Sequence, residues 1–191
     1  GAPFDRTKHG LFLPSQEAAH SHRRIIRVKG DSAGRAIMET LKTKLRTTPS
    51  ITLVEGATAY KITKNSNSNL SVYCSTSEGQ TIEYRCACLV LATGGVGHLY
   101  KITTNPCDSC GAGLAMAAQA GALIADAEFV QFHPTAIDIN TDPAPLATES
   151  LRGEGATIIN RFGRRFLLDC DHRAELAPRD IVARKVVESI Q

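Results

Sequence analysis

The sequence lacks a long apolar run, a strong excess of charge and a second cysteine pair. The longest apolar stretch, residues 111–127, is interrupted and rich in alanine and glycine, so it does not predict a membrane span. The net charge is only +3, and no basic run is interleaved with aromatic residues, which argues against a nucleic-acid partner. The 191 residues, 42% hydrophobic and 21% charged, fit one globular domain or parts of two.

The six cysteines do not form a recognisable metal or disulfide framework. Cys107 and Cys110 have the spacing of a redox or metal-binding pair, but a structural zinc site needs a second pair or suitably spaced histidines. Cys86 and Cys88 would share one face of a predicted strand, where buried thiols are common. With no signal peptide recognisable, we expect unpaired, reduced cysteines, no metal and a cytoplasmic location.

Local patterns predict a helix followed by β-hairpins in the first half of the chain. Asp31 and Ser32 suit a helix N-cap, apolar residues then recur at helical spacing, and Pro49 ends the element. Short β-rich runs at residues 51–54, 57–63, 70–75 and 81–84 are separated by turn residues. The chain begins without methionine and its last predicted helix runs to Gln191, so we expect an internal piece of a larger protein.

Two glycine-containing segments in the middle of the chain favour nucleotide binding. Residues 86–92 are apolar throughout, which predicts a strand buried on both faces of a parallel sheet, and a Thr-Gly-Gly turn follows. Doubly wound folds admit nucleotides at such strand ends, although no GxGxxG follows here. Residues 110–120 predict a helix of small residues, whose N-terminal N–H groups could face an anion. Residues 123–125 and 129–130 read as short strands.

The most polar stretch, residues 148–156, holds two carboxylates, an arginine, two hydroxyl groups and two glycines. Together with residues 131–135 and 176–180 it predicts the wall of one polar cleft; the alternative is a solvated loop with capping residues. Residues 157–160 and 165–168 would form a hairpin, and Pro178 marks a helix start with Arg179 in its first turn. The cationic residues 20–24 are either a surface charge run or a loop around an anion.

Five strings in order carry a family resemblance: EAAHSHRRI (17–25), LATGG (91–95), QFHPTA (131–136), TESLRGEG (148–155) and ELAPRDIV (175–182). They resemble the FAD-dependent succinate dehydrogenase/fumarate reductase flavoproteins, and the first string favours the L-aspartate oxidases among them. The resemblance implies an α/β fold with α+β elements. Residues 1–126 would be part of a Rossmann-like FAD-binding domain with a β-hairpin insertion, and residues 127–191 would begin a capping domain that closes over a dicarboxylate.

The resemblance also implies roles for individual residues. His133 and Thr148 would bind substrate carboxylate oxygens, Glu17 would face the substrate ammonium, and Arg179 would exchange a proton with the substrate. Glu149 and Arg152 would orient Arg179. The positions expected to bind FAD are Ala92, Thr93, Gly94, Gly95, Gly111, Ala112, Gly113, His20 and Ser21.

Each role has a structural alternative. His133 could be a core histidine, Arg179 could pair with Asp180, and Glu17 could be a solvated loop residue. Ala112 stands where the family has an acidic residue that touches the flavin, and Ala18-Ala19 replaces a glycine pair, which restricts the loop.

The implied function is oxidation of L-aspartate to iminoaspartate in NAD biosynthesis, with hydride transfer to FAD and then to oxygen or fumarate. A quinolinate synthase would be a possible partner. The family's amino-terminal dinucleotide-binding unit and two downstream site residues are not in this sequence, so we expect the chain alone to be inactive and to hold FAD weakly. The alternatives are a fumarate reductase or succinate dehydrogenase flavoprotein, and a non-catalytic dicarboxylate- or flavin-binding homologue.

Overall fold

A computed structural model describes residues 1–30, 32–65 and 69–190. The chain forms two compact units. Unit 1 comprises Gly1–Thr52, Gln131–Ile137 and Leu146–Gln191, and unit 2 comprises Leu53–Val130 and Asp138–Pro145. The mixed α/β fold class is confirmed, with small sheets and short helices in place of one large sheet.

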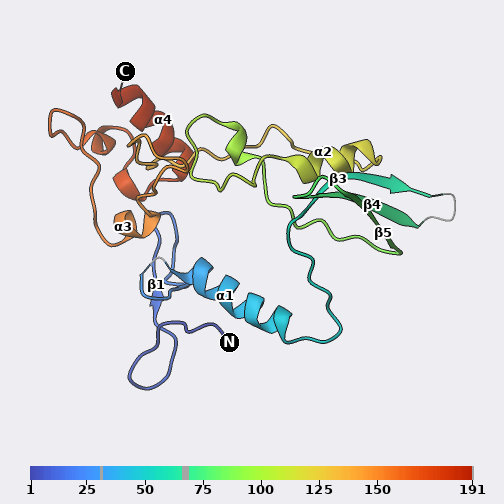
Figure 1. Ribbon diagram of the computed structural model, residues 1–191. Helices are drawn as coiled ribbons and strands as arrows, with labels where there is room; N and C mark the ends of the chain where they lie inside the picture. The colour runs from blue at the N-terminus through green and yellow to red at the C-terminus, as the bar shows by residue number, and fades with distance from the viewer. Residues whose placement is uncertain (31, 66–68, 191) are drawn as a thin grey trace. The chain divides into compact units, whose positions relative to one another are not determined.

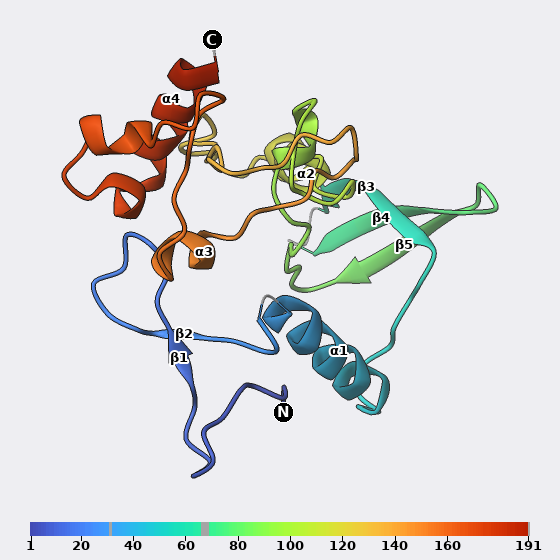
Figure 2. The same cartoon turned by 90° about the vertical axis from the view of Figure 1, so that its left-hand side faces the viewer.

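Figures 1 and 2 show the order of the elements along the chain. The strands are β1 (Pro14–Ser15), β2 (Ile25–Ile26), β3 (Ala57–Lys64), β4 (Leu70–Thr76) and β5 (Thr81–Cys86). The α-helices are α1 (Ala33–Arg46), α2 (Ala112–Gln119), α3 (Glu149–Gly153) and α4 (Arg179–Ile190). The 3-10 helices among the described residues are η1 (Gly97–Leu99), η2 (Phe166–Asp169) and η3 (Ala174–Leu176).

Unit 2 is built on an antiparallel meander in which β4 pairs with both β3 and β5. Ser71 and Cys74 of the central strand are buried, and Ile62 of β3 lies opposite Val72. The hairpin predictions for residues 57–63, 70–75 and 81–84 are therefore confirmed, whereas residues 51–54 form no strand. Helix α2 contacts β3 (Figures 1 and 2).

The buried parallel strand predicted at residues 86–92 is wrong for this chain. Cys86 ends β5, and residues 87–95 form neither helix nor strand. Val90 is 86% exposed. A strand buried on both faces needs paired neighbours and a covering layer on each side, and no described strand pairs with this segment. Cys86 and Cys88 therefore do not share a strand face, and all six cysteines are free thiols.

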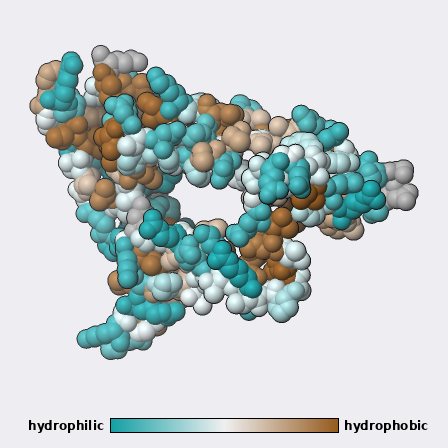
Figure 3. Space-filling view, viewed as in Figure 1, coloured by the Kyte–Doolittle hydropathy of each residue, from teal (hydrophilic) through white to brown (hydrophobic). Residues whose placement is uncertain are grey.

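Unit 1 has its apolar core where the last segments of the chain meet. Leu167 of η2 and Val182 of α4 are almost fully buried, together with Ala174 of η3 and Ala177, which follows η3. Helix α4 begins directly after Pro178, as predicted, because proline has no N–H to leave unpaired in a first turn. Figure 3 shows apolar side chains on the surface around α4 as well.

Helix α1 confirms the predicted helix, which ends before Pro49. Ser32 occupies the N-cap position but its side chain makes no capping hydrogen bond, and Asp31 lies outside the described residues. No residue of this helix is buried; Ile37, Met38 and Leu41 are at least 39% exposed.

Three further strand predictions are wrong. Residues 123–125 and 129–130 form no strand, and Leu123 is 95% exposed. The hairpin predicted around residues 162–163 is present only as a turn, in which the Asn160 side-chain oxygen accepts the N–H groups of Phe162 and Arg164 at 3.0 Å each. This local bonding takes the place of strand pairing, and residues 166–169 form η2 instead.

The predicted boundary between residues 126 and 127 stays a prediction, since the two units group segments by contact and do not test it. Across the described ranges, no helix has the length and apolar character that a bilayer crossing requires.

Candidate functional site

The polar stretch at residues 148–156, predicted as a cleft wall or a solvated loop, begins as a short helix. Thr148 is the N-cap of α3, and its hydroxyl oxygen accepts the N–H of Ser150 at 3.4 Å. A threonine hydroxyl has one proton to donate in addition to its acceptor lone pairs. The cap uses only the acceptor, so the Thr148 proton is available for a bound anion.

Helix α3 packs closely against the loop that contains Glu17. A side chain at Gly153 would put its Cβ 2.6 Å from the carbonyl oxygen of Gln16, so this contact requires glycine. The carboxylate of Glu17 then lies 4.0 Å from the Arg179 guanidinium. Gly153 therefore allows α3 to lie close to the loop at residues 16–17, a use of glycine that the sequence pattern indicated in general terms.

Glu149 is the centre of the charged cluster and is 5% exposed. Its Oε2 accepts the Nε–H of Arg179 and forms an ion pair with Arg179 Nη2. Its Oε1 lies 3.5 Å from Nη2 of Arg152, which is 3% exposed. One carboxylate thus stands between two guanidinium groups. Arg179 also donates through Nη1 to the side chain of Gln131 at 3.0 Å.

The structure decides one alternative for Arg179. Asp180 pairs with Arg184 at 2.7 Å, one helical turn further along α4, while Arg179 pairs with Glu149 across the unit. First-turn pairing between Arg179 and Asp180 is therefore not what holds the arginine.

His133 lies beside this cluster as a neutral donor. The N–H of Thr135 points at its Nδ1 at 3.3 Å, so the neutral ring carries its proton on Nε2. Burial lowers the pKa of His133 from the ordinary 6.5, the cations Arg179 and Arg152 lower it further, and Glu149 opposes them. A neutral imidazole that donates through Nε2 is suited to a carboxylate oxygen.

In unit 2, the Thr-Gly-Gly turn contacts the start of α2 through backbone groups. The N–H of Gly111 donates to the carbonyl of Gly95 at 3.1 Å. A Cβ at Gly113 would come 1.8 Å from Oγ1 of Thr93, so only glycine fits there. Both Gly94 (φ +73°) and Gly111 (φ +79°) have left-handed backbone conformations.

This arrangement fits a cofactor that is bound by backbone. The residues from Ala92 to Gly95 are exposed, and α2 begins beside them with an exposed Ala112 and no acidic residue in its first turn. In unit 1, His20 has a buried Nδ1 with no hydrogen-bond partner among the described residues, while Ser21 accepts from Arg24 at 3.0 Å. An unsatisfied buried nitrogen is the kind of group that a ligand can satisfy.

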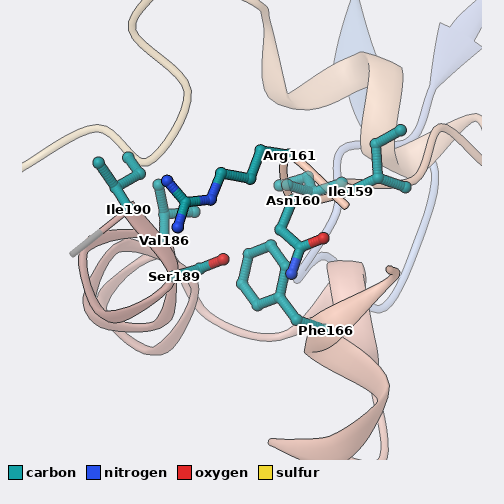
Figure 4. A pocket seen from close by; sticks show the side chains of 8 residues that line it. Ile159, Asn160, Arg161, Phe166, Val186, Ser189 and Ile190 are labelled. Atoms are coloured by element: carbon teal, nitrogen blue, oxygen red, sulfur yellow. The ribbon is translucent and has the colours of Figure 1, made fainter. Parts of the chain in front are cut away.

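A separate hollow of about 270 Å³ lies beside the C-terminal half of α4 (Figure 4). Phe166, Val186 and Ile190 are among its lining residues, so its walls are largely apolar. None of the predicted site residues lines it.

Within unit 1 the predicted substrate residues thus come together from three separate segments of the chain. Sequence reasoning assigned no role to Gln131, which accepts from Arg179, or to Glu175, although both lie in quoted strings. It also missed Arg165, which pairs with Glu175. The charged residues 20–24 are partly explained by a surface contact, since Arg23 and Arg27 lie 4.0 and 3.7 Å from Glu154.

Comparison with known proteins defines the class. The family described as "FAD binding domain" matches residues 1–191, and the chain belongs to this family. Among curated proteins, it is 52% identical over 184 residues to the L-aspartate oxidase of Caulobacter vibrioides, covering 96% of this chain and 36% of that protein. It is 46% identical over 190 residues to the L-aspartate oxidase of Mesorhizobium japonicum, covering 100% of this chain and 37% of that protein.

A solved structure of E. coli quinol fumarate reductase FrdA is also similar, with a TM-score of 0.88 and 26% identity over 98% of this chain and 34% of that chain. The chain therefore spans about a third of the length of the proteins that it matches. These findings confirm the flavoprotein resemblance inferred from the five strings.

Proposed function

We propose that the protein containing this chain is an FAD-dependent oxidoreductase that oxidises L-aspartate to iminoaspartate. The observation that carries the proposal is the convergence in unit 1 of Glu17, Glu149 and Arg179, with His133 and Thr148 beside them. The similarity to L-aspartate oxidases over nearly the whole chain supports the same activity.

Aspartate has two carboxylates and one ammonium group, so its site needs several donors and one well-placed anion. His133 offers Nε2–H and Thr148 offers its hydroxyl proton to a substrate carboxylate. Glu17 lies 4.0 Å from Arg179, and its carboxylate makes no hydrogen bond to the other described residues, so it can turn to the ammonium group.

Arg179 is the group proposed to exchange a proton with the substrate. An arginine normally stays protonated, so its neighbours must fix its direction and moderate its charge. Glu149 accepts the Nε–H of Arg179 and forms an ion pair with its Nη2. Arg179 also lies in the first turn of α4, at the positive end of the helix dipole. Arg152 lies on the opposite side of Glu149 and orients that carboxylate.

FAD, when bound, supplies the redox chemistry by accepting the hydride. Backbone groups of Ala92, Thr93, Gly94 and Gly95, with the start of α2 at Gly111, Ala112 and Gly113, are the proposed contacts in unit 2. His20 and Ser21 are the proposed contacts in unit 1.

Several finer points belong to the same proposal. Oxygen or fumarate would reoxidise the flavin, a quinolinate synthase would use the iminoaspartate, and the protein would act in the cytoplasm. The 191-residue chain by itself would be inactive, because it spans about a third of its relatives' length. An active, yellow preparation of this chain alone would overturn that point.

A second candidate is a flavoprotein that interconverts succinate and fumarate. The similarity to quinol fumarate reductase FrdA favours it. Such substrates carry no ammonium group, so Glu17 would have no partner in the substrate. A third possibility, a non-catalytic binding protein, would follow from Ala112 if flavin were not retained.

One experiment separates the three. The full-length natural protein is assayed with aspartate and with succinate while its flavin spectrum is recorded. We expect aspartate oxidation with a bound flavin. In Glu17→Gln, kcat/KM for aspartate should fall by an amount that corresponds to about 1.5–3 kcal/mol of lost transition-state stabilisation, the value of a hydrogen bond to a charged group. Glu154→Gln is the matched control, since Glu154 is in the same unit but faces Arg23 and Arg27.

Activity with succinate that Glu17→Gln leaves unchanged would favour the second candidate instead. A protein with neither activity nor flavin would favour the third.

A further inference from the structure

Glu175 is a buried carboxylate to which the proposed mechanism assigns no role. It lies in η3 and is 3% exposed. Arg165 donates Nε to both of its oxygens, at 2.9 and 3.1 Å, and Nη2 to Oε2 at 2.6 Å. The N–H of Ile158 donates to Oε1 at 3.2 Å. Both oxygens are therefore held, from two different segments.

The main chain of the same residue holds Arg152. Nη1 of Arg152 donates to the carbonyl oxygen of Glu175 at 2.6 Å. Its Nε and Nη2 are buried and have no hydrogen-bond partner among the described residues, with Nη2 3.5 Å from Glu149. The direction of the Arg152 guanidinium thus depends on where η3 places that one carbonyl.

The charge of Glu175 acts on Arg152 as well. Burial lowers the pKa of Arg152, and neighbouring Arg179 lowers it further, while Glu149 and Glu175 raise it. A guanidinium with few hydrogen bonds and little exposure needs this second anion, because an uncompensated buried charge is costly.

We propose that Glu175, clamped by Arg165, is a positioning residue that holds Arg152 and, through it, the Glu149–Arg179 pair. The inference rests on the proposed function, since it takes that pair to be the reacting site. In the described structure Glu175 makes no hydrogen bond or ion pair with Glu149 or Arg179, so it acts on that pair through Arg152.

The same unit contains a matched pair that lacks the connection. Asp171 accepts Nε and Nη2 of Arg173 at 2.9 Å each, in the same two-pronged geometry. Its carboxyl group contacts neither Arg152 nor Glu149 in the described structure. The two pairs share the two-pronged bond but differ in span, since Asp171 and Arg173 are two residues apart and Glu175 and Arg165 are ten apart. An effect of the two-pronged bond alone would therefore appear in both pairs.

The test compares Glu175→Gln, Arg165→Lys and Asp171→Asn in the full-length protein. Glutamine keeps the size of Glu175 and can still accept the Ile158 N–H, but it lacks the charge. We expect kcat to fall at least about tenfold in Glu175→Gln with little change in KM, as for interactions made in the transition state. Arg165→Lys keeps every charge and loses only the fork, so a smaller fall in kcat is expected. Asp171→Asn should leave kcat unchanged.

A readout without turnover separates this inference from the proposed function. The pKa of His133, measured by NMR, responds to Arg179, Glu149 and Arg152. Loss of the Glu175 anion should lower it, and Asp171→Asn should not change it. If the protein oxidised neither substrate, the proposed function would fail and the His133 comparison would still test the positioning.

Equal effects of Glu175→Gln and Asp171→Asn on kcat and on His133 would overturn the proposal. If Glu175→Gln did not fold, Arg165→Lys would decide: an unchanged kcat and an unchanged His133 pKa would overturn it as well.

Discussion

The two units hold their candidate functional residues in opposite ways. In unit 1 charged side chains fix one another: Arg152, Glu149 and Arg179 form a row in which the middle carboxylate is buried. In unit 2 the candidate cofactor segment is fixed by backbone and glycine, with Gly113 against Thr93 and Gly111 bonded to Gly95. The first arrangement should be sensitive to charge, and the second to added volume.

The largest effect is expected from Arg179→Gln in unit 1. It removes the proposed proton-exchanging group, and such groups contribute about 10²–10⁴-fold to rate, so kcat for aspartate should fall by that order. Steady-state kinetics of the full-length protein measure it. Arg184→Gln is the control, because Arg184 is on the same helix and pairs with the exposed Asp180. Equal losses in the two variants would show that Arg179 has no special role.

Added volume in unit 2 should be the next largest effect. In Gly113→Ala the new Cβ would lie 1.8 Å from Thr93 Oγ1, and overpacking of this kind costs about 1–3 kcal/mol. Urea unfolding measures the loss. Gly95→Ala is the control, since its Cβ would meet nothing within 4 Å. The double variant Gly113→Ala/Thr93→Ala should recover part of the stability, because it removes Oγ1 while Cβ of residue 93 still lies 2.7 Å from the new Cβ. If it recovered none, the contact with Oγ1 would not be the cause.

The pKa of His133 tests the charge sensitivity of unit 1 more finely. NMR titration should find it below 6.5, and Arg179→Gln should raise it, because Arg179 is one of the cations that lower it. A folded-state pKa below the unfolded one means that the unfolded chain binds the proton more tightly. The stability that the neutral His133 ring contributes to the folded state is therefore present above pH 6.5 and is lost as the pH falls through the folded-state pKa.

His133→Gln should flatten the dependence of unfolding free energy on pH in that window. A His133 that titrates at or above its ordinary pKa would contradict the environment described here.

The sequence predicted the elements that depend on neighbouring residues better than those that depend on residues far away in the chain. The hairpins of β3, β4 and β5, and the start of α4 at Pro178, depend on neighbouring residues, so local patterns sufficed. The buried strand at residues 86–92 failed because a parallel strand needs partners from elsewhere, and apolar composition alone does not supply them.

The site shows the same limit. The charged strings indicated which residues matter, but not that Thr148 caps a helix or that Gly153 allows contact with residue 16. Glu175 escaped notice because its main-chain carbonyl, not its side chain, meets Arg152, and a main-chain contact has no signature in the sequence.

The smallest effect is expected at Ala112, where the sequence resemblance predicts an acidic residue that touches the flavin in related proteins. Helix α2 has no acidic residue in its first turn, and an acid there should stabilise the helix by about 0.3–1 kcal/mol. If the family's acidic residue touches the flavin, Ala112→Asp should also tighten FAD binding by about threefold to tenfold, the value of one ordinary hydrogen bond. Flavin fluorescence titration of the full-length protein measures this.

Ala112→Asn separates the two causes, because it accepts a hydrogen bond without charge. Tighter FAD binding in both variants would indicate a hydrogen bond to the cofactor, whereas a gain in Ala112→Asp alone would indicate the helix dipole or charge. Weaker binding in Ala112→Asp would mean that an anion at this position repels the cofactor, and that unit 2 binds FAD through its backbone without an acidic contact at residue 112.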